Sequence, residues 1–515
     1  MSRRTVFSFL RRSPVLVAAL GLALASSVSS AWAQTGFESP PRPASPQPLQ
    51  VPEFNQQRLA NGLGLAVVER HAQPLVTAWL LVQAGGAYDP AGKSGLAELS
   101  LALMGKGVQR GAGPLPAADL AAEIEALGTQ LEIGSAARSS HLGVTVASHR
   151  LDASLGLLSE MLRSPSLAEE EFQRLQAQAV DALKLGRSDP GQLAAQIGRR
   201  LYWGDSPHGQ QPTLASLSRI QLDDVRAFHR LHVRPERVTL LLAGDITPAQ
   251  ARSLADKHFG KWRAKRMALP QLPSLVPKSL AARTVLVDLP GAGQSAVQVM
   301  APTAGPSPVP FARLTPEAQA TEVLTQQANA LANAVLGQGY SSRINQEVRI
   351  KRGLSYGAAS GIDAQPGGAQ LVTSAQTKHE SAGEVAALLQ QEIRRLSSER
   401  VPDPELVARR AVLIGDFGRQ LETTAGLAAL AAEGLMRGRP LAELSRVPEE
   451  LAALDGDTVR TLATRHWQGE RLRTVIVADF KQGGLALRQQ FPDALVLKAE
   501  ELDLASPTLR RGGRK

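Results

Sequence analysis

The alternation of apolar and polar residues predicts short strands separated by paired helices. In the first half of the chain, β-branched and apolar runs at 65–68 and 76–82 are typical of strands, and helical sequence begins at Ser94. Further along this half we expect a strand at 141–147, amphipathic helices over 151–186 and a closing strand at 237–245. The pattern therefore predicts one α+β unit in this half.

A second set of elements follows in the same order. The matching segments are strands at 284–288 and 295–299, a helix over 316–336, a strand at 369–373, long helices over 380–440 and a closing strand at 473–479. A repeat of about 220 residues is too long for a solenoid and indicates duplication of one domain. We therefore predict an α+β fold of two homologous domains, each with a mostly antiparallel sheet and helices packed on one face.

The N-terminal segment has the features of a targeting signal. Residues 1–33 combine a basic start, a short apolar stretch and the small-residue pattern Ala-Trp-Ala before Gln34. This predicts a cleavable signal peptide and an exported, periplasmic protein. The pair Arg3-Arg4 leaves the twin-arginine route open beside the ordinary secretory one. After residue 34 no apolar run reaches the roughly 20 residues that span a bilayer, so we expect no membrane span.

Composition shifts divide the rest of the chain. The predicted parts are a Pro-rich leader at 34–52, an N-terminal domain at 53–266, a linker at 267–278, a C-terminal domain at 279–500 and a basic tail at 501–515. Within that tail, we expect a solvated end at Arg510, Arg511, Arg514 and Lys515.

Composition also excludes several functions. The net charge is +10, but aromatic residues make up only 4% and no basic stripe with interleaved aromatics occurs, so nucleic-acid binding is not expected. The chain has no cysteine. Disulfides, a Cys nucleophile and thiolate metal sites are therefore excluded.

Residues 85–108 read GGAYDPAGKSGLAELSLALMGKGV. This segment resembles the signature G-x-A-H-x-x-E-H-x-x-x-K-G of the insulinase (pitrilysin) family, which includes peptidases similar to the mitochondrial processing peptidase. Further similarity at 207–209 and 238–245 extends the resemblance over nearly the whole mature chain. The resemblance implies that this chain forms one half of a clam-shaped peptidase.

The resemblance also implies a lost zinc site. The family's inverted motif places two His and one Glu on one helical face. The two imidazoles bind Zn²⁺, and the carboxylate acts on the metal-bound water. Those positions are Glu98, Leu101 and Ala102 here, and the third ligand aligns with Ala182. If the alignment were shifted by one residue, Asp181 would take the position of the third ligand. The site would then have two carboxylates and no imidazole. We therefore expect no metal and no cofactor bound by this chain.

Residues 337–356 read GQGYSSRINQEVRIKRGLSY and resemble the family segment G-G-x-x-S-R-L-x-x-x-L-R-x-x-x-G-L-x-Y. By that resemblance, Arg349 and Tyr356 are the family's substrate-side pair. A guanidinium and a phenol can both donate hydrogen bonds to a scissile carbonyl as it becomes an oxyanion. The alternative is structural, with Arg349 capping a helix and Tyr356 packing at a strand edge.

Three functional hypotheses follow. The first is the zinc-less subunit of a periplasmic heterodimeric metallopeptidase, inactive alone, whose homologous H-x-x-E-H partner supplies the zinc for cleaving unfolded peptides. The second is a non-enzymatic peptide-binding or scaffold protein with the same fold. The third is a zinc enzyme with an unconventional site. For the one close histidine pair, His229 and His232, we expect packing or capping rather than metal binding.

Overall fold

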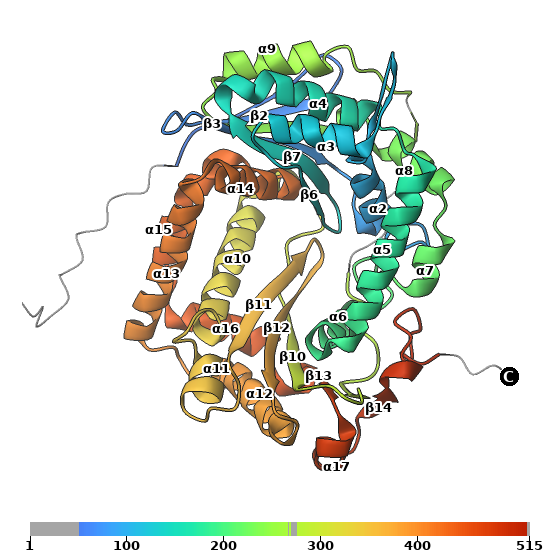
Figure 1. Ribbon diagram of the computed structural model, residues 1–515. Coiled ribbons are helices and arrows are strands. Elements are labelled where there is room, and N and C mark those ends of the chain that lie inside the picture. The colour runs from blue at the N-terminus through green and yellow to red at the C-terminus, as the bar shows by residue number, and fades with distance from the viewer. Residues whose placement is uncertain (1–50, 266, 269–275, 512–515) are drawn as a thin grey trace, which may run out of the picture. The chain divides into compact units, whose positions relative to one another are not determined.

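The computed structural model describes residues 51–265, 267–268 and 276–511 (Figure 1). The predicted signal peptide, nearly all of the leader, and most of the linker lie outside the described residues. The elements described below all belong to the part of the chain that begins at Gln50.

The first sheet has six strands in the order β1-β2-β8-β3-β7-β6. They are β1 (Phe54–Arg58), β2 (Gly64–Glu69), β3 (Leu75–Val82), β6 (Glu132–Ser135), β7 (Ser140–Ala147) and β8 (Val238–Gly244). Only β2 and β8 pair in parallel; the other neighbours are antiparallel. A separate hairpin joins β4 (Val108–Arg110) to β5 (Gly113–Leu115).

The second sheet repeats this plan in the order β11-β12-β10-β13-β9-β14. Its strands are β9 (Thr284–Asp288), β10 (Ser295–Thr303), β11 (Ala358–Gln365), β12 (Gly368–Thr377), β13 (Arg473–Ala478) and β14 (Leu495–Lys498). Strand β9 runs parallel to β13 and β14, and the other pairs are antiparallel. Five strands occupy equivalent places in the two sheets, which confirms the duplicated, mostly antiparallel α+β fold.

Helices connect the strands in the predicted order. In the first half they are α2 (Leu96–Met104), α3 (Ala117–Ala126), α4 (Leu151–Arg163), α5 (Glu169–Ser188), α6 (Pro190–Trp203), α7 (Leu214–Arg219), α8 (Leu222–His232) and α9 (Pro248–Phe259). In the second half they are α10 (Pro316–Leu336), α11 (Arg343–Asn345), α12 (Ala382–Ser398), α13 (Asp403–Leu421), α14 (Thr424–Arg437), α15 (Val447–Ala452), α16 (Gly456–His466) and α17 (Phe480–Gln490). In the described part of the chain, no helix combines the length and the apolar character needed to cross a bilayer.

Each half packs its own helices on one face of its sheet, as predicted. In the first half, the alternating residues Val76, Ala78 and Leu80 of β3 lie in one core with Leu155 of α4 and Ala251 of α9. Period-two burial of this kind follows from the alternation of side chains across a strand. The second half builds the equivalent core on β10 and β12 with α10 and α12.

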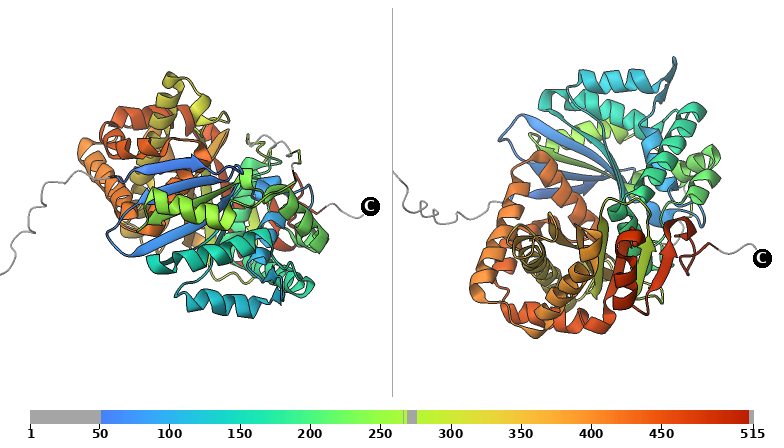
Figure 2. Two further views of the ribbon diagram at one scale, coloured as in Figure 1. Left: turned by 90° about the horizontal axis from the view of Figure 1, so that it is seen from above. Right: turned by 60° about the horizontal axis from the view of Figure 1, so that its bottom comes forward.

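The opposite face of each sheet is covered by a helix from the other half (Figures 1 and 2). Helix α14 packs Leu427 and Ala431 on Ala66 and Leu241 of the first sheet. Helix α6 packs on the second sheet, with these residues in one core: Leu193, Ile197 and Leu201 of α6, and Val285, Ala296 and Val475 of the sheet. Because each half supplies a helix to the sheet of the other, the two halves share their cores. Helix α6 lies outside the helices that the sequence predicted over 151–186.

The C-terminal boundary at residue 500 needs correction. Leu502, Leu504 and Leu509 are all buried, and they join the core that α6 forms with the second sheet. Residues 501–511 therefore continue the packed structure, because three leucines here have apolar surface to bury. Arg510 and Arg511, which the sequence predicted to be solvated, are exposed.

Candidate functional site

Helix α2, which carries the zinc-motif positions, is fixed at its start by Asp89. The Asp89 carboxylate accepts hydrogen bonds from the backbone N–H groups of Gly95 at 2.7 Å and Ala97 at 2.8 Å. Gly95 has a φ of 104°, a left-handed conformation that favours glycine. Burial raises the pKa of Asp89 to about 7, against the opposing effect of these two hydrogen bonds. The start of α2 is thus held by a partly buried carboxyl group.

The zinc-motif positions do not provide a zinc ligand set. Leu101 is buried among the core residues, Ala102 is half-buried, and only Glu98 presents a carboxylate to solvent. On α5, Ala182 is exposed and Asp181 pairs with Lys184 at 3.0 Å. Zinc sites in proteins need nitrogen, sulfur or oxygen ligands, which leucine and alanine lack. Among the described residues no three His, Asp or Glu side chains gather closely enough to hold a metal ion.

Arg349 and Tyr356 lie together, although seven residues separate them in the sequence. The Arg349 guanidinium carbon lies 4.8 Å from the centre of the Tyr356 ring and 5.1 Å from that of Tyr340. Arg349 is therefore in cation–π contact with two tyrosines. The sequence indicated only Arg349 and Tyr356; the available signal for Tyr340 was its place in the same glycine-rich segment.

This Tyr340–Arg349–Tyr356 stack is open to solvent. Tyr356 is 90% exposed and Tyr340 62% exposed. Among the described residues, no carboxylate lies within ion-pair distance of Arg349. An arginine whose charge is not neutralised by its own chain keeps its donors free for another molecule.

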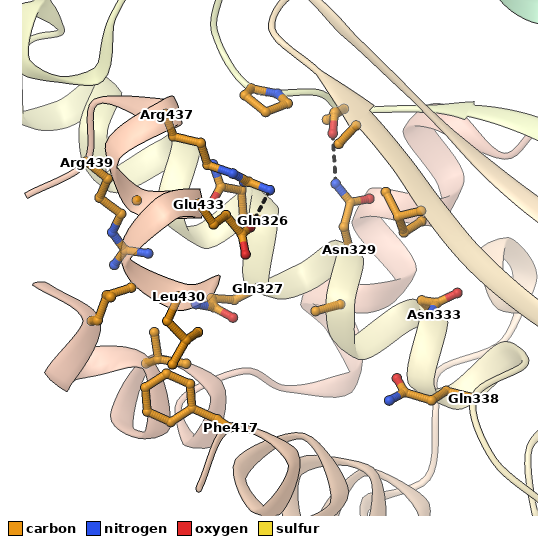
Figure 3. Close-up of a pocket in the computed structure, with 18 residues that line it drawn as sticks. Gln326, Gln327, Asn329, Asn333, Gln338, Phe417, Leu430, Glu433, Arg437 and Arg439 are labelled. Carbon is orange, nitrogen blue, oxygen red and sulfur yellow. Dashed lines mark hydrogen bonds and ion pairs between the residues drawn. The ribbon is translucent and has the colours of Figure 1, made fainter. Parts of the chain in front are cut away.

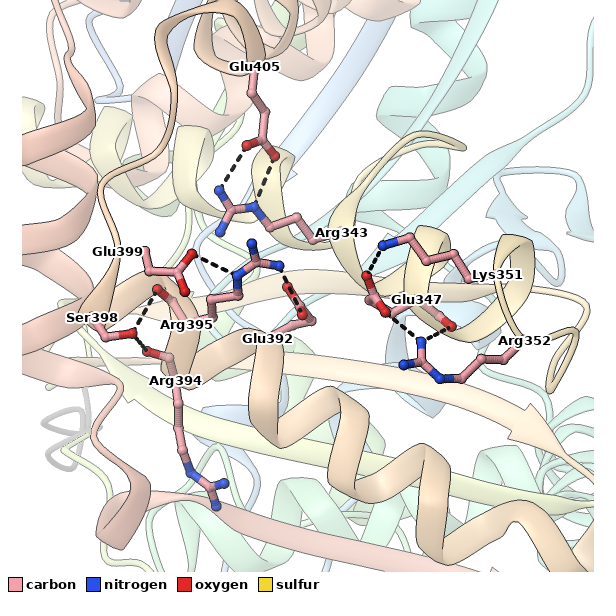
Figure 4. Close-up of polar contacts among 10 residues, drawn as sticks. All are labelled: Arg343, Glu347, Lys351, Arg352, Glu392, Arg394, Arg395, Ser398, Glu399 and Glu405. Atoms are coloured by element: carbon pink, nitrogen blue, oxygen red, sulfur yellow. Dashed lines mark hydrogen bonds and ion pairs between the residues drawn. The ribbon is translucent and has the colours of Figure 1, made fainter.

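A set of ion pairs holds the segment that carries Arg349 (Figure 4). Arg349 lies in a π-helical turn, η5 (Gln346–Ile350), a distortion often found at functional sites. Glu347 binds Lys351 and Arg352, each at 2.5 Å, and Arg343 makes a two-pronged contact with Glu405 of α13 at 3.0 and 2.8 Å. These contacts fix the backbone on either side of Arg349, while its own side chain contacts the two tyrosine rings and makes no ion pair within the described residues.

Tyr356 is one of the residues that line a pocket of about 440 Å³ beside the second sheet. Its other lining residues include Gln298 of β10 and Gln376 of β12. Tyr356 lies two residues before β11, which pairs only with β12 and forms the edge of the described sheet. The stack, the pocket and the sheet edge are therefore contiguous.

A second pocket of about 370 Å³ lies between α10, α14 and β11 (Figure 3). Amide side chains are frequent in its lining, with Gln326, Gln327, Asn329 and Asn333 from α10. Most of these amides form hydrogen bonds with other groups of the chain; for example, Asn329 donates to the Ala304 carbonyl at 2.8 Å. Ile362 and Ala364 of β11 also line it, so this pocket adjoins the same sheet edge.

His208, in the 207–209 segment that carried part of the resemblance, connects the two halves. Its Nε2 donates to Asp363 Oδ1 of β11 at 3.0 Å, and Trp203 Nε1 of α6 donates to the other carboxylate oxygen at 2.8 Å. Gln370 adds a third hydrogen bond to Asp363 at 3.1 Å. This polar network secures α6 on the second sheet. The sequence did not indicate a role for Asp363.

The Asp363 network should make stability depend on pH. Burial alone would raise the pKa of Asp363, but the hydrogen bonds from His208, Gln370 and Trp203 outweigh it and lower the pKa. A lowered folded-state pKa stabilises the protein above about pH 4, and this contribution is lost as the pH falls further. We expect Asp363→Asn to lower the free energy of unfolding by about 2 kcal/mol at neutral pH, and by less near pH 3. Urea unfolding at several pH values measures this; a difference that does not change with pH would contradict the assignment.

The histidine pair is structural, as expected. His229 Nε2 donates to the Leu162 carbonyl at 2.9 Å. The buried His232 ring packs against Tyr88 and Phe228. Burial, with the nearby charges of Arg237 and Arg234, lowers the pKa of His232 to about 4, which keeps this ring neutral at physiological pH.

Comparisons with known proteins agree with this geometry. The model described as insulinase (peptidase family M16) matches residues 65–188, and the model described as peptidase M16 inactive domain matches residues 219–413. An uncharacterized zinc protease of Streptomyces coelicolor is 22% identical over 371 residues, which cover 71% of this chain and 77% of that protein.

Solved structures show the same fold. A protease from Helicobacter pylori superimposes with a TM-score of 0.74 at 20% identity, covering 83% of this chain and 100% of that one. The periplasmic protease PqqL from Escherichia coli superimposes with a TM-score of 0.64 at 12% identity, covering 85% of this chain but only 50% of PqqL. Our chain thus corresponds in fold to half of that larger protein.

Proposed function

This chain belongs to the insulinase family of peptidases (peptidase family M16), and we propose that it is the zinc-less subunit of a periplasmic peptidase heterodimer. The observation that carries the proposal is the exposed Tyr340–Arg349–Tyr356 stack, whose cation has no carboxylate partner within the described residues. The chain keeps substrate-side donors, while three of its four zinc-motif positions, Leu101, Ala102 and Ala182, have hydrocarbon side chains that cannot bind zinc. That the protein is exported is inferred from the signal peptide predicted at residues 1–33.

In the proposed pair, this chain contributes donors to the reacting carbonyl. Arg349 and Tyr356 donate hydrogen bonds to the scissile carbonyl oxygen, and those bonds strengthen as negative charge develops on that oxygen. In this family a bound zinc supplies the activated water, and the positions 98, 101, 102 and 182 of this chain do not fit that ion. The partner is a homologous chain with an intact H-x-x-E-H motif, and the substrates are unfolded peptides.

The match to PqqL fits a role as one half of a larger peptidase arrangement. This chain covers half of PqqL, while it covers all of the Helicobacter pylori protease chain. A second chain of similar size would supply the other half of the larger arrangement. The stack lies beside β11, the edge strand of the second sheet, where an extended peptide could pair as an added strand. The N–H groups of Ala358 and Ser360, at the end of β11 nearest the stack, already donate to Asn345 and to the Gly337 carbonyl, so such a peptide would pair further along the strand.

A second candidate function is a peptide-binding protein without enzymatic activity. It is favoured by one observation, the loss of every imidazole from the zinc-motif positions. The same stack and pocket would then hold a peptide without cleaving it.

The decisive experiment is reconstitution with a zinc-bearing homologue from the same organism. We expect the purified mature chain to bind no stoichiometric zinc and to show no chelator-sensitive peptidase activity, because it lacks ligands for the metal. Mixing the two chains should give peptide cleavage that neither shows at that level alone. A tightly bound zinc and unaided cleavage by this chain would overturn the proposal; peptide binding without cleavage in the mixture would favour the second function.

A further inference from the structure

A pocket of about 560 Å³ is lined by four arginines. It lies where the end of α5, helices α6 and α7 and the C-terminal segment 502–511 meet. Its arginines are Arg187, Arg200, Arg219 and Arg511. The pocket is separate from the Tyr340–Arg349–Tyr356 stack, whose residues do not line it.

Two of these arginines, Arg187 and Arg200, each have a buried donor without a partner. Arg200 is 2% exposed; it binds Asp205 at 2.6 Å and the Gly204 carbonyl, yet its Nε is buried without a hydrogen-bond partner. The Nε of Arg187 is likewise buried and unpartnered. Among the described residues, no carboxylate lies within ion-pair distance of Arg187, Arg219 or Arg511. Buried unpartnered donors are rare in native proteins, because each loses its hydrogen bonds to water.

The charges in the pocket do not balance. Two acidic residues share the lining, Asp205 and Asp503. Asp205 is engaged by Arg200, and Asp503 accepts the backbone N–H of Ala505 at 2.9 Å. Burial lowers the pKa of Arg187 and the positive charge of Arg511 lowers it further, while the Asp503 carboxylate opposes this shift without reversing it. An anion between these arginines would relieve their repulsion.

We propose that this pocket binds an oxyanion, either a carboxylate or a phosphate group, through Arg187, Arg200, Arg219 and Arg511. The planar guanidinium presents a fork of N–H donors that matches both groups in geometry. The pocket shares Ser94, Gln210 and Gln211 with the neighbouring cleft that contains Glu98. A bound anion therefore lies beside the start of α2. The inference stands apart from the peptidase proposal, since it needs neither a partner nor hydrolysis.

Calorimetric titration of the mature chain alone tests the proposal. The probes are inorganic phosphate and two peptides of one sequence, one with a free terminal carboxylate and one amidated. We expect Arg187→Gln and Arg511→Gln each to weaken binding of the effective probe by at least ~10-fold, because each removes a charge-assisted contact. Arg174→Gln is the matched control, since Arg174 lies on the same helix, is exposed and pairs with Glu171. It should leave affinity unchanged.

The outcomes are distinguishable. Binding of phosphate with equal affinity for the two peptides identifies a free phosphate-type ligand, whereas preference for the free-acid peptide identifies a terminal carboxylate. Arg511 is exposed, so Arg511→Gln should not disturb core packing. If the Arg187→Gln variant failed to fold, the Arg511→Gln variant would still test the proposal. The proposal is overturned if none of the three probes binds at millimolar concentration, or if Arg511→Gln retains full affinity.

Discussion

Replacing Arg349 with alanine is expected to lower the peptidase activity of the reconstituted pair by ~100-fold or more, because one preorganised donor to the developing oxyanion is removed. The fall should appear in kcat rather than KM, since that hydrogen bond strengthens only as the carbonyl oxygen gains charge. The fold should be unaffected: Arg349 makes no ion pair within the described residues, and the segment around it is held by Glu347 and Arg343. Steady-state kinetics on a peptide substrate measure the effect.

Three further variants make this test specific. Tyr356→Phe removes only the phenolic donor and should give a smaller loss of kcat. Arg349→Lys keeps the charge but not the guanidinium fork, and should remain impaired. Arg488→Ala is the matched control: Arg488 also stacks on an aromatic ring, that of Phe480 on α17, at 5.4 Å. Full activity of the Arg349→Ala pair would remove the active-site assignment and leave the structural alternative.

Replacing Trp203 with alanine should lower the free energy of unfolding by about 4 kcal/mol, one of the largest effects expected of a single substitution here. The Trp203 side chain is fully buried, contacts the rings of Tyr202 and His208, and donates to Asp363. Its loss leaves a cavity where α6 meets the second sheet, and removes one donor from a buried carboxylate. Urea unfolding followed by circular dichroism measures the change.

A conservative variant separates packing from hydrogen bonding at this position. Trp203→Phe keeps an aromatic ring and loses the N–H donor, so we expect a loss of about 1–2 kcal/mol. Since each half covers a sheet of the other, both variants should shift one common transition. A separate transition for the second half, with the first half unchanged, would show that the exchanged helices do not couple the two halves.

Local pattern was sufficient for much of the fold. The β-branched runs at 76–82 and 295–299 predicted β3 and β10, and the helix predicted over 316–336 has those bounds in the structure. Strand β11 was missed because its sequence, AASGIDAQ, lacks the alternation that marks a half-buried strand. Helix α6 begins at Pro190 with Asp189 as its cap, a start signal that the interpretation of 151–186 did not use.

The sequence by itself determined the duplicated order of elements, the family and the lack of imidazole at the zinc-motif positions, because each of these is recorded in residue type and local spacing. Only the tertiary structure decided that α6 and α14 are exchanged between the sheets, that Tyr340 joins Arg349, and that Trp203 reaches Asp363 across 160 residues. The physical reason is that an apolar stripe specifies that a surface must be buried, whereas the partner that buries it depends on how the whole chain packs.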